Sequence, residues 1–392
     1  MELSRRITGI TGGGSDGWGL YYRAQALKAE GAEVTELNIG EHDIRTDPAI
    51  LEAMHEAAKA GHTGYAAVPG ITPLREEIAA RAQERTGVPT KAANVMVTAG
   101  GQAGLFAAHS AVLDPGETGL YLDPHYTTYP GTIRSVGGLP HAVETRPRDA
   151  FQPRADEIAE AARATRARSL LINTPNNPTG TVYSRSTLEG IAQACEEADL
   201  WLISDEVYDS QVWEGRHLST RALPGMEART MVVGSMSKSH AMTGSRIGWI
   251  IAPEAAVTQL EQLAINTTYG VQGYIQRAAL FALQQGTALE QKIAEPFRRR
   301  RAIALDLLAG QQAVTAIPPQ GAMYMMLDIR ATGMSGEEFA LALLEEERIA
   351  VMPGESFGAA ASGHIRVALT VEDARFADAF GRVLRFAAAR AA

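Results

Sequence analysis

Cysteine is almost absent from this sequence, because Cys195 is the single cysteine among 392 residues. An intrachain disulfide and a cysteine-rich metal site are therefore excluded, and we expect no metal site. No apolar run approaches the roughly 18 residues that a membrane-spanning helix requires. The stretch Met1-Glu2-Leu3-Ser4-Arg5-Arg6 is polar, and no apolar segment typical of a signal peptide comes after it. These absences predict a cytoplasmic protein that is not inserted in a membrane.

Basic residues are also fewer than acidic ones. The sequence has 36 Lys and Arg against 45 Asp and Glu, which gives a formal net charge of -9 and a pI of about 5.6. A nucleic-acid-binding domain needs a basic surface, so we expect no nucleic-acid partner. The only basic run, Arg298-Arg299-Arg300-Arg301, lies in a helical pattern and is typical of a solvated face or a subunit interface.

The chain is long enough for about two domains, and short apolar runs alternate with helical patterns along most of it. The apolar runs are residues 33–39, 95–97, 119–122, 169–172, 200–203, 231–233, 247–251, 323–328 and 364–369. The helical patterns are residues 20–30, 101–113, 127–136, 154–164, 186–198, 288–309, 335–346 and 371–388. Continuous apolar strands separated by helices predict an α/β fold with a mostly parallel sheet between two helical layers. We expect a large α/β domain at residues 47–290 and a smaller α+β domain built from residues 1–46 and 291–392.

A lysine stands in the hydroxyl-rich turn that begins at Gly234, after the predicted strand 231–233. In open α/β sheets, ligands bind at the carboxyl ends of strands, and Lys238 occupies such an end. Ser235, Ser237 and Arg246 flank it with hydrogen-bond donors that suit a phosphate. An isolated Ser-x-Ser-Lys is usually a solvated turn, so the interpretation depends on the residues at the ends of the other strands.

Four further strands also end in polar residues. These ends are Asn173-Thr174-Pro175-Asn176-Asn177-Pro178-Thr179-Gly180, Ser204-Asp205-Glu206-Val207-Tyr208, Asp123-Pro124-His125-Tyr126 and Thr98-Ala99-Gly100-Gly101-Gln102. Together with Lys238 they supply an amine for a Schiff base, a carboxylate, a phenol, an amide, an aromatic ring and a glycine turn that opens a helix and can bind an anion. That set matches the functional groups of pyridoxal phosphate. Taken singly, Asp205 could be an N-cap, Tyr126 a core aromatic and Asn177 a turn residue, but their occurrence after successive strands favours a cofactor site.

Three motifs carry a resemblance to a known family. They are Asn177-Pro178-Thr179-Gly180, Asp205-x-x-Tyr208 and Ser235-x-Ser-Lys238 followed by Arg246-x-Gly248. In type and order they resemble the class I/II aminotransferases of fold type I, the aspartate aminotransferase family. The resemblance implies a pyridoxal phosphate-dependent enzyme that moves an amino group from an L-amino acid to a 2-oxo acid.

The resemblance also implies roles for individual residues. Lys238 forms the internal aldimine and then carries the proton between the substrate and the cofactor, Asp205 pairs with the pyridine nitrogen, and Tyr208 completes the catalytic set. The implied cofactor-binding residues are Gly100, Gly101, Gln102, Tyr126, Asn177, Asp205, Tyr208, Ser235, Ser237, Lys238, Arg246 and Tyr65. Tyr65 matches a tyrosine that reaches the phosphate of a neighbouring subunit, so the resemblance implies a homodimer. Gly40, Asn177 and Arg366 are the implied substrate-binding residues, with Arg366 gripping the α-carboxylate.

Two departures from the family pattern concern the substrate. Glu41-His42-Asp43 stands where Glu-Pro-Asp is usual, and we expect this change to put His42 near the mouth of the site. Gln102 occupies a place where some prokaryotic aspartate-using members have lysine, which puts a preference for dicarboxylates in doubt.

Alternative functions remain at this stage. A carbon–sulfur β-lyase of the same fold shares the Lys, Asp and Tyr set. Gly12-x-Gly14-x-x-Gly17 imitates a dinucleotide fingerprint and raises a nicotinamide-dependent oxidoreductase as a distant alternative, although the preceding strand would be only residues 7–10. A transcription-regulator module would need a DNA-binding domain, for which the first 40 residues leave no room.

Overall fold

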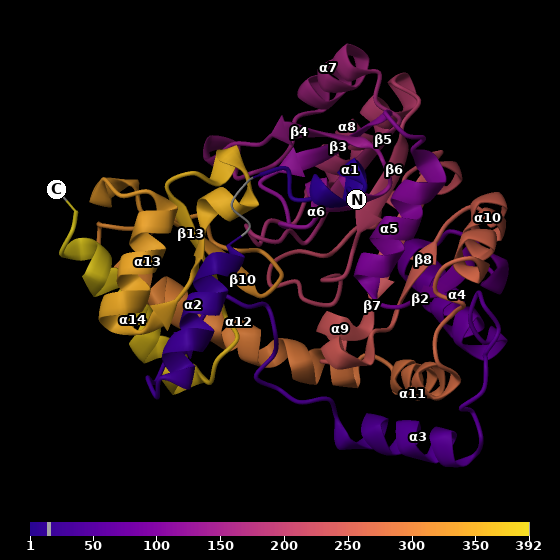
Figure 1. Cartoon of the computed structure of the whole chain (residues 1–392), viewed down its shortest axis with the longest axis horizontal. Coiled ribbons are helices and arrows are strands. Elements are labelled where there is room, and N and C mark those ends of the chain that lie inside the picture. Colours follow the sequence, from indigo (N-terminus) through magenta and orange to yellow (C-terminus); the bar gives the residue numbers. More distant parts are fainter. Residues whose placement is uncertain (14–16, 392) are drawn as a thin grey trace.

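The computed structural model describes residues 1–13 and 17–391, and within these residues a seven-stranded sheet forms the centre of the larger part of the molecule (Figure 1). In spatial order the strands are β2 Val95–Thr98, β8 Gly248–Ile251, β7 Thr230–Ser235, β6 Trp201–Asp205, β5 Ser169–Asn173, β3 Thr118–Asp123 and β4 Leu139–Glu144. β8 is antiparallel to both of its neighbours, and the other pairs are parallel. The predicted mostly parallel sheet is confirmed.

Helices cover both faces of this sheet because successive strand residues point in opposite directions. Leu171 and Ile203 pack into one core, whereas Leu170 and Leu202 pack into another. One face is covered by α5 Gly101–Val112, α6 Tyr129–Ser135 and α10 Glu254–Ile265. The other is covered by α4 Thr72–Thr86, α7 Ala155–Thr165, α8 Arg185–Glu197 and α11 Gly273–Gln284. α3 Pro48–Lys59 packs against α11. The three-layer α/β/α architecture predicted from the sequence is therefore correct.

The C-terminal third builds a second, antiparallel sheet, which lies on the left in Figure 1. Its strands in spatial order are β12 Met352–Pro353, β13 His364–Ala368, β10 Tyr324–Asp328 and β9 Thr315–Ala316. Its helices are α12 Ala288–Ala309, α13 Gly336–Glu347 and α14 Asp373–Ala388. These elements share one core, in which Phe297, Phe339 and Phe380 are fully buried.

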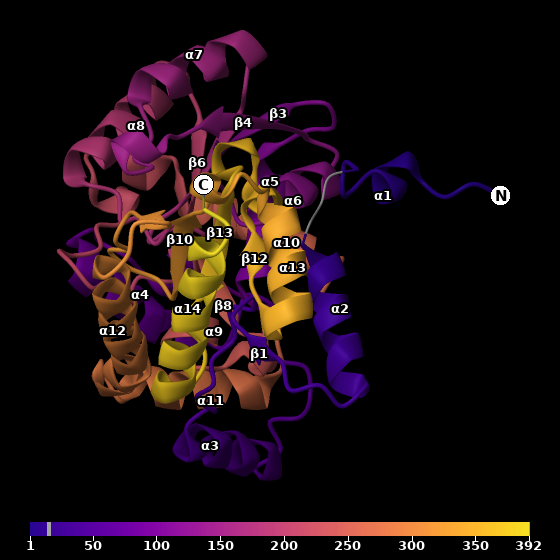
Figure 2. The same cartoon turned by 90° about the vertical axis from the view of Figure 1, so that its left-hand side faces the viewer.

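The N-terminal segment joins this C-terminal part. In α2 Trp18–Ala29, Ala24 and Leu27 pack in one cluster with Leu344 of α13, and β1 Thr35–Glu36 pairs with β11 Ile349–Ala350. The short helix α1 Arg5–Thr8 projects from the body (Figure 2). The predicted domain limits at residues 47 and 290 stay a prediction, since α12 runs continuously through the second of them. No helix in the described part of the chain is long and apolar enough to cross a membrane.

Two sequence expectations about strands differ from the structure. The sequence does not predict β4, because Leu139-Pro140-His141-Ala142-Val143-Glu144 lacks a continuous apolar run. It is an edge strand whose residues are mostly exposed, and an edge tolerates proline and polar residues. Conversely, of the predicted strand 33–39 only Thr35–Glu36 forms a strand, which pairs with β11.

The basic run in α12 is divided between solvent and the interior. The side chains of Arg298 and Arg299 are 55% and 50% exposed, but Arg300 is only 4% exposed. Its guanidinium donates to Asp373 Oδ1 at 2.9 Å, to both carboxylate oxygens of Asp43 at 2.9 and 2.6 Å, and to the Leu369 carbonyl at 3.0 Å. The expected solvated face therefore holds for only part of the run, and Arg300 ties the segment around Asp43 to α12.

Replacing Arg300 with alanine should destabilise the fold. Asp43 and Asp373 would both lose a buried partner. Removing one partner from such a network lowers the free energy of unfolding by about 3 kcal/mol. Arg298→Ala is the matched control, because its ion pair is exposed and should contribute no more than about 1 kcal/mol. Chemical denaturation of both variants checks the difference, and equal free energies of unfolding would contradict it.

Candidate active site

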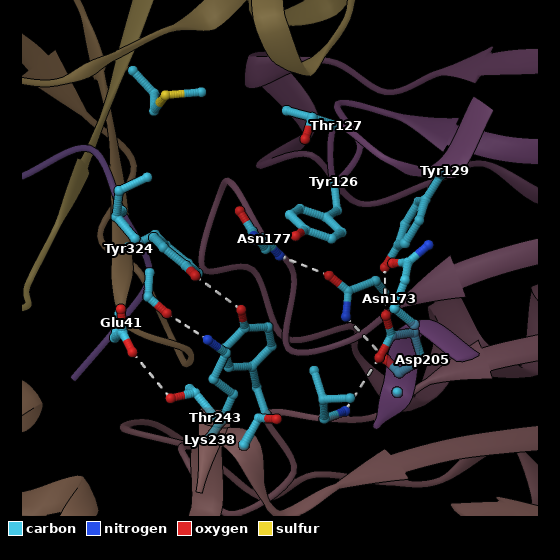
Figure 3. A pocket seen from close by; sticks show the side chains of 18 of the residues that line it. Glu41, Tyr126, Thr127, Tyr129, Asn173, Asn177, Asp205, Lys238, Thr243 and Tyr324 are labelled. Atoms are coloured by element: carbon cyan, nitrogen blue, oxygen red, sulfur yellow. Dashed lines mark hydrogen bonds between the residues drawn. The ribbon is translucent and has the colours of Figure 1, made fainter. Parts of the chain in front are cut away.

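A cavity of about 350 Å³ lies where the carboxyl ends of β5, β6 and β7 face the C-terminal sheet. Figure 3 shows side chains from several elements converging on it. The residues predicted from the sequence that line it are Gly40, Gly101, Gln102, Tyr126, Asn177, Asp205, Tyr208, Ser235, Ser237, Lys238, Arg246 and Arg366. Gly100 and Tyr65 are the two predicted site residues that do not line it.

Lys238 lies in the short helix α9 Met236–Ser239, which comes directly after β7. Its Nζ donates a hydrogen bond to the carbonyl oxygen of Gly40. Its own carbonyl accepts from His42 Nε2 at 2.9 Å and from Gln211 Nε2 at 3.2 Å. The amine of Lys238 is thus held against the segment that comes after β1, on a backbone fixed from two sides.

His42 does not lie at the mouth of the site, as the sequence led us to expect. Its ring turns inward, behind Lys238, and packs edge to face on Phe297 with 5.3 Å between ring centroids. Burial, aided by the positive charge of Lys238, lowers the pKa of His42 to about 4. His42 is therefore neutral at pH 7, and Glu41 is the residue of this turn that lines the cavity.

Asp205 ends β6 on the opposite side of the cavity and is only 5% exposed. Tyr129 donates to its Oδ2 at 2.7 Å, and the Val207 amide donates to its Oδ1 at 3.3 Å. Burial raises the pKa of Asp205 to about 6, although these two hydrogen bonds act in the opposite direction. A carboxylate in such surroundings is suited to pair with a cationic ring nitrogen.

Arg366 comes from β13 and is buried between two aromatic rings. Its guanidinium carbon lies 4.3 Å from the ring centroid of Tyr324 and 4.6 Å from that of Phe357. Its Nη1 donates to Asn177 Oδ1 at 2.8 Å and its Nη2 to the Asn38 carbonyl at 2.5 Å. Its Nε and the side-chain amide of Asn38 are buried without a hydrogen-bond partner in the described chain. Unpaired buried donors are costly, so this site is built for a ligand that accepts hydrogen bonds, such as a carboxylate.

The other end of the cavity offers donors for an anion. The first turn of α5 leaves backbone N–H groups at Gly101 and Gln102 without helical partners. Ser235, Ser237 and Arg246 line the cavity next to that turn. Gly100 does not line the cavity but shapes it: its φ is +82°, and a Cβ there would lie 2.3 Å from the Arg246 guanidinium. Gly100 therefore allows the helix end and Arg246 to approach each other.

Tyr208 and Tyr324 both line the cavity and contact each other there. Their hydroxyl oxygens are 2.9 Å apart, and both side chains are buried. Tyr126 also lines the cavity and packs edge to face on Tyr129, with ring centroids 5.8 Å apart. The cavity thus has an amine, a carboxylate, a phenol, an aromatic ring and an anion cradle at separate points, which fits the chemical groups of pyridoxal phosphate.

Tyr65 lies outside this arrangement in the single chain. Tyr65 is 91% exposed and packs edge to face on Tyr269, with ring centroids 4.9 Å apart. Tyr269 is itself 52% exposed. Any role of Tyr65 at a cofactor thus requires a second chain.

Several residues that line the cavity were not singled out from the sequence, among them Tyr129, Asn173 and Tyr324. Tyr129 holds Asp205, and its spacing of three residues from Tyr126 on a helical pattern could have indicated a shared face. Asn173 ends β5, and its side chain donates to the Asp205 carbonyl at 2.9 Å. Tyr324 stands in an apolar strand, where no sequence signal separates it from a core aromatic.

The glycine motif near the N-terminus cannot be followed in full, because Gly14, Ser15 and Asp16 lie outside the described residues. The residues before it form α1 Arg5–Thr8, a helical turn. A dinucleotide fingerprint requires a strand at that place. Within the described residues, no cluster of three or more His, Cys, Asp or Glu could hold a metal ion.

Comparison with known proteins agrees with this chemistry. A family model described as aminotransferase class I and II matches residues 32–383. The arginine–pyruvate transaminase of Pseudomonas aeruginosa is 38% identical over 371 residues, which cover 95% of this chain and 94% of that protein. The aspartate/prephenate aminotransferase of Thermus thermophilus is 33% identical over 368 residues, 93% of each chain. A solved structure of Thermus thermophilus aspartate aminotransferase with maleate matches with a TM-score of 0.92 at 32% identity, covering 98% of this chain and 100% of that one.

These relatives are named as aminotransferases, and neither the β-lyase nor the oxidoreductase alternative gains support from them. The match extends over nearly the whole chain and includes the strands whose ends form the cavity. The chain belongs to the class I and II aminotransferases, enzymes that use pyridoxal phosphate to transfer an amino group from an amino acid to a 2-oxo acid.

Proposed function

We propose that transamination in this enzyme is carried out by Lys238, Asp205 and Tyr208, with Arg366 binding the substrate. The observation that carries this proposal is the convergence of Lys238, Asp205 and the buried, incompletely paired Arg366 on one cavity. Pyridoxal phosphate, when bound, supplies an aldehyde that accepts the amino group and a ring that withdraws electrons from the substrate Cα. Side chains of this chain bind the cofactor and the substrate, orient them and move the proton.

Lys238 holds and moves the proton. Its Nζ contacts the Gly40 carbonyl, so the amine can leave one acceptor and approach the substrate Cα without a change in the backbone of α9. A positioned side chain that transfers a proton contributes about 10²- to 10⁴-fold to the rate.

Asp205 and its hydrogen-bond partners keep a proton on the ring nitrogen. The carboxylate pairs with that nitrogen only when it is ionised, and Tyr129 and the Val207 amide both favour the ionised form. Tyr208 and Asn177 would bind the ring hydroxyl, and Tyr126 would hold the ring by its face. Gly101, Gln102, Ser235, Ser237 and Arg246 would hold the phosphate at the N-terminus of α5, and Gly100 lets Arg246 approach that helix end.

Arg366 binds the α-carboxylate of the substrate. Its planar guanidinium matches a carboxylate in two parallel hydrogen bonds, and the rings of Tyr324 and Phe357 fix its plane. Asn177 and Gly40 complete the substrate site from the two sides of the cavity.

The active form is proposed to be a homodimer. The exposed aromatic pair of Tyr65 and Tyr269 supports this, because large exposed aromatics often mark an interface. In a dimer Tyr65 would reach the phosphate of the neighbouring site. Sedimentation of the active enzyme as a monomer would contradict this proposal, whereas the cytoplasmic location predicted from the sequence stays a prediction.

The names of the relatives indicate which substrates to test first. One relative is named an arginine–pyruvate transaminase and another an aspartate/prephenate aminotransferase. A basic donor with pyruvate and an acidic donor are therefore the two leading candidates.

Lys238→Ala should lower kcat by about 10³-fold, because the variant lacks the group that moves the proton. Borohydride reduction followed by mass spectrometry should attach the cofactor to Lys238 in the wild type and to no residue in the variant. Lys59→Ala is the matched control, since Lys59 is exposed and pairs only with Glu56. Turnover of the Lys238 variant at the wild-type rate would show that this assignment is wrong.

Tyr129→Phe should raise the pKa of Asp205, because it removes a hydrogen bond to the ionised carboxylate. Cofactor affinity should decline as the pH falls through the pKa of Asp205, and in the variant this decline should begin about one pH unit higher. Cofactor titrations followed by absorbance between pH 5 and pH 8 measure the midpoint. Tyr183→Phe, a change in a buried tyrosine of a separate core, is the control. The same midpoint in all three proteins would rule out the role of Tyr129.

Arg366→Lys should lower kcat/KM by about 10- to 100-fold, because a lysine keeps the charge but loses the paired hydrogen bonds. A matched amine without the α-carboxylate should react equally slowly with wild type and variant. Arg330→Lys is the control, because Arg330 is 63% exposed and pairs with Asp328 at the end of β10 in the same sheet. An unchanged kcat/KM for amino acids in the Arg366 variant would contradict the assignment.

A further inference from the structure

A second cavity, of about 400 Å³, lies on the face of the large sheet that α4 and α11 cover. Its wall is formed by α4, the chain between β6 and β7, parts of β7 and β8, and the start of α12. Ser235, at the end of β7, is the one lining residue that this second cavity shares with the active-site cavity. The volume lies within the range of small-molecule sites, and no step of the proposed function uses it.

Basic side chains outnumber acidic ones among the described residues that line the second cavity. The four arginines are Arg81, Arg85, Arg216 and Arg221, and the three carboxylates are Glu206, Asp209 and Glu290. The lining thus has a formal charge of +1 when His217, its one histidine, is neutral. An excess of positive charge in a concave site attracts anions.

The three carboxylates already have partners within the wall. Glu290 accepts hydrogen bonds from both Arg81 and Arg85, and Arg85 also donates to Asp209. Glu206 is bound by the hydroxyls of two serines and by the histidine of the wall. The charges of these acids are therefore compensated without the other two arginines.

Arg221 is a buried cation that no described carboxylate pairs with. It is only 4% exposed, and its Nη1 donates to Thr90 Oγ1 at 2.8 Å. Its Nε is buried and has no hydrogen-bond partner in the described chain. Glu206 and Glu227 act on the guanidinium through their charge but form no ion pair with it. A buried guanidinium in this state is costly, and an anion in the second cavity would supply the missing acceptor.

Two further groups add to this side of the second cavity. Arg216 is exposed at its rim and has no ion pair or hydrogen bond with a described residue. The indole of Trp249 lies against β7 because Gly234 has no side chain, and a Cβ there would lie 2.3 Å from Trp249 Nε1. That indole nitrogen also has no partner in the described chain, so it is a third available donor.

We infer that the second cavity binds a small oxyanion, a carboxylate or a phosphate group, through Arg221 and Arg216. The planar fork of a guanidinium matches two oxygens of either group. Because Ser235 is the only lining residue in common, this ligand is separate from the cofactor and from the amino acid substrate. The inference goes beyond the proposed function and does not depend on it.

The test is a calorimetric titration of the pyridoxal phosphate-loaded enzyme with sodium phosphate and, separately, with sodium acetate. Chloride keeps the ionic strength constant, so that general screening does not contribute to the difference between the anions. The loaded cofactor keeps added phosphate out of its own site, and its absorbance verifies that each variant is folded. Saturable binding of at least one anion is expected, and the tighter one identifies the group that the site prefers.

Arg221→Gln should weaken this binding by at least about tenfold, because it removes a charge-assisted hydrogen bond. Arg221→Lys keeps the charge and should bind more tightly than Arg221→Gln. Arg216→Gln should weaken binding by about threefold, and this exposed, unpaired position can change without harm to the fold. The matched control is Arg185→Gln on α8, which removes a 67% exposed arginine outside the second cavity and should have no effect.

Arg366→Lys distinguishes the second cavity from the substrate site, because Arg366 lines only the active-site cavity. It should retain the binding event that Arg221→Gln weakens. The inference is overturned if neither anion saturates the wild type, if Arg221→Gln and Arg216→Gln both bind as tightly as the wild type, or if only Arg366→Lys loses binding. The titration contains no amino donor, so its result is independent of whether the enzyme transaminates.

Discussion

The buried guanidinium of Arg366 is the interaction on which the rest of the site depends. It joins the carbonyl of Asn38 in the N-terminal segment, the side chain of Asn177 after β5, and the rings of Tyr324 and Phe357 in the C-terminal part. Taking a guanidinium out of water is costly unless its donors are paired. Here Nε stays unpaired, so part of that cost is compensated only when a ligand carboxylate binds. The same side chain therefore joins three parts of the chain and keeps one buried donor, which serves the recognition of substrate in the function that we propose.

Much of the chemistry was predictable because it sits at strand ends. An apolar run marks a strand, the polar residues after it must lie at the edge of the sheet, and parallel strands bring those edges together. Lys238, Asp205 and Asn177 could be placed in one cavity by that rule alone. Arg366 could not, because a strand arginine in the C-terminal part has no local signal. Its identification depended on resemblance to the family.

The sequence did not indicate which way a side chain points within a turn. His42 was expected at the mouth, yet its ring packs inward on Phe297, and Glu41 points into the cavity instead. The two residues are adjacent, and only the path of the backbone decides which one faces the ligand. The same holds for Arg300, whose burial depends on Asp43 and Asp373, residues 257 and 73 positions away in the chain. Contacts between residues so far apart in the chain leave no periodic pattern in the sequence that would predict them.

The segment from Asn38 to Asp43 is held at both ends by arginines from the C-terminal part, Arg366 and Arg300. Between those anchors, His42 and the Gly40 carbonyl bind Lys238, whereas the side chain of Glu41 is exposed. The backbone is fixed by its neighbours, so exchanging that one side chain should change the fold's stability by no more than about 0.5 kcal/mol, as for ordinary surface positions. By contrast, a change that moves the backbone of residues 38–43 would displace hydrogen-bond partners of Lys238 and of Arg366 together, so the two sides of the cavity are mechanically coupled through this segment.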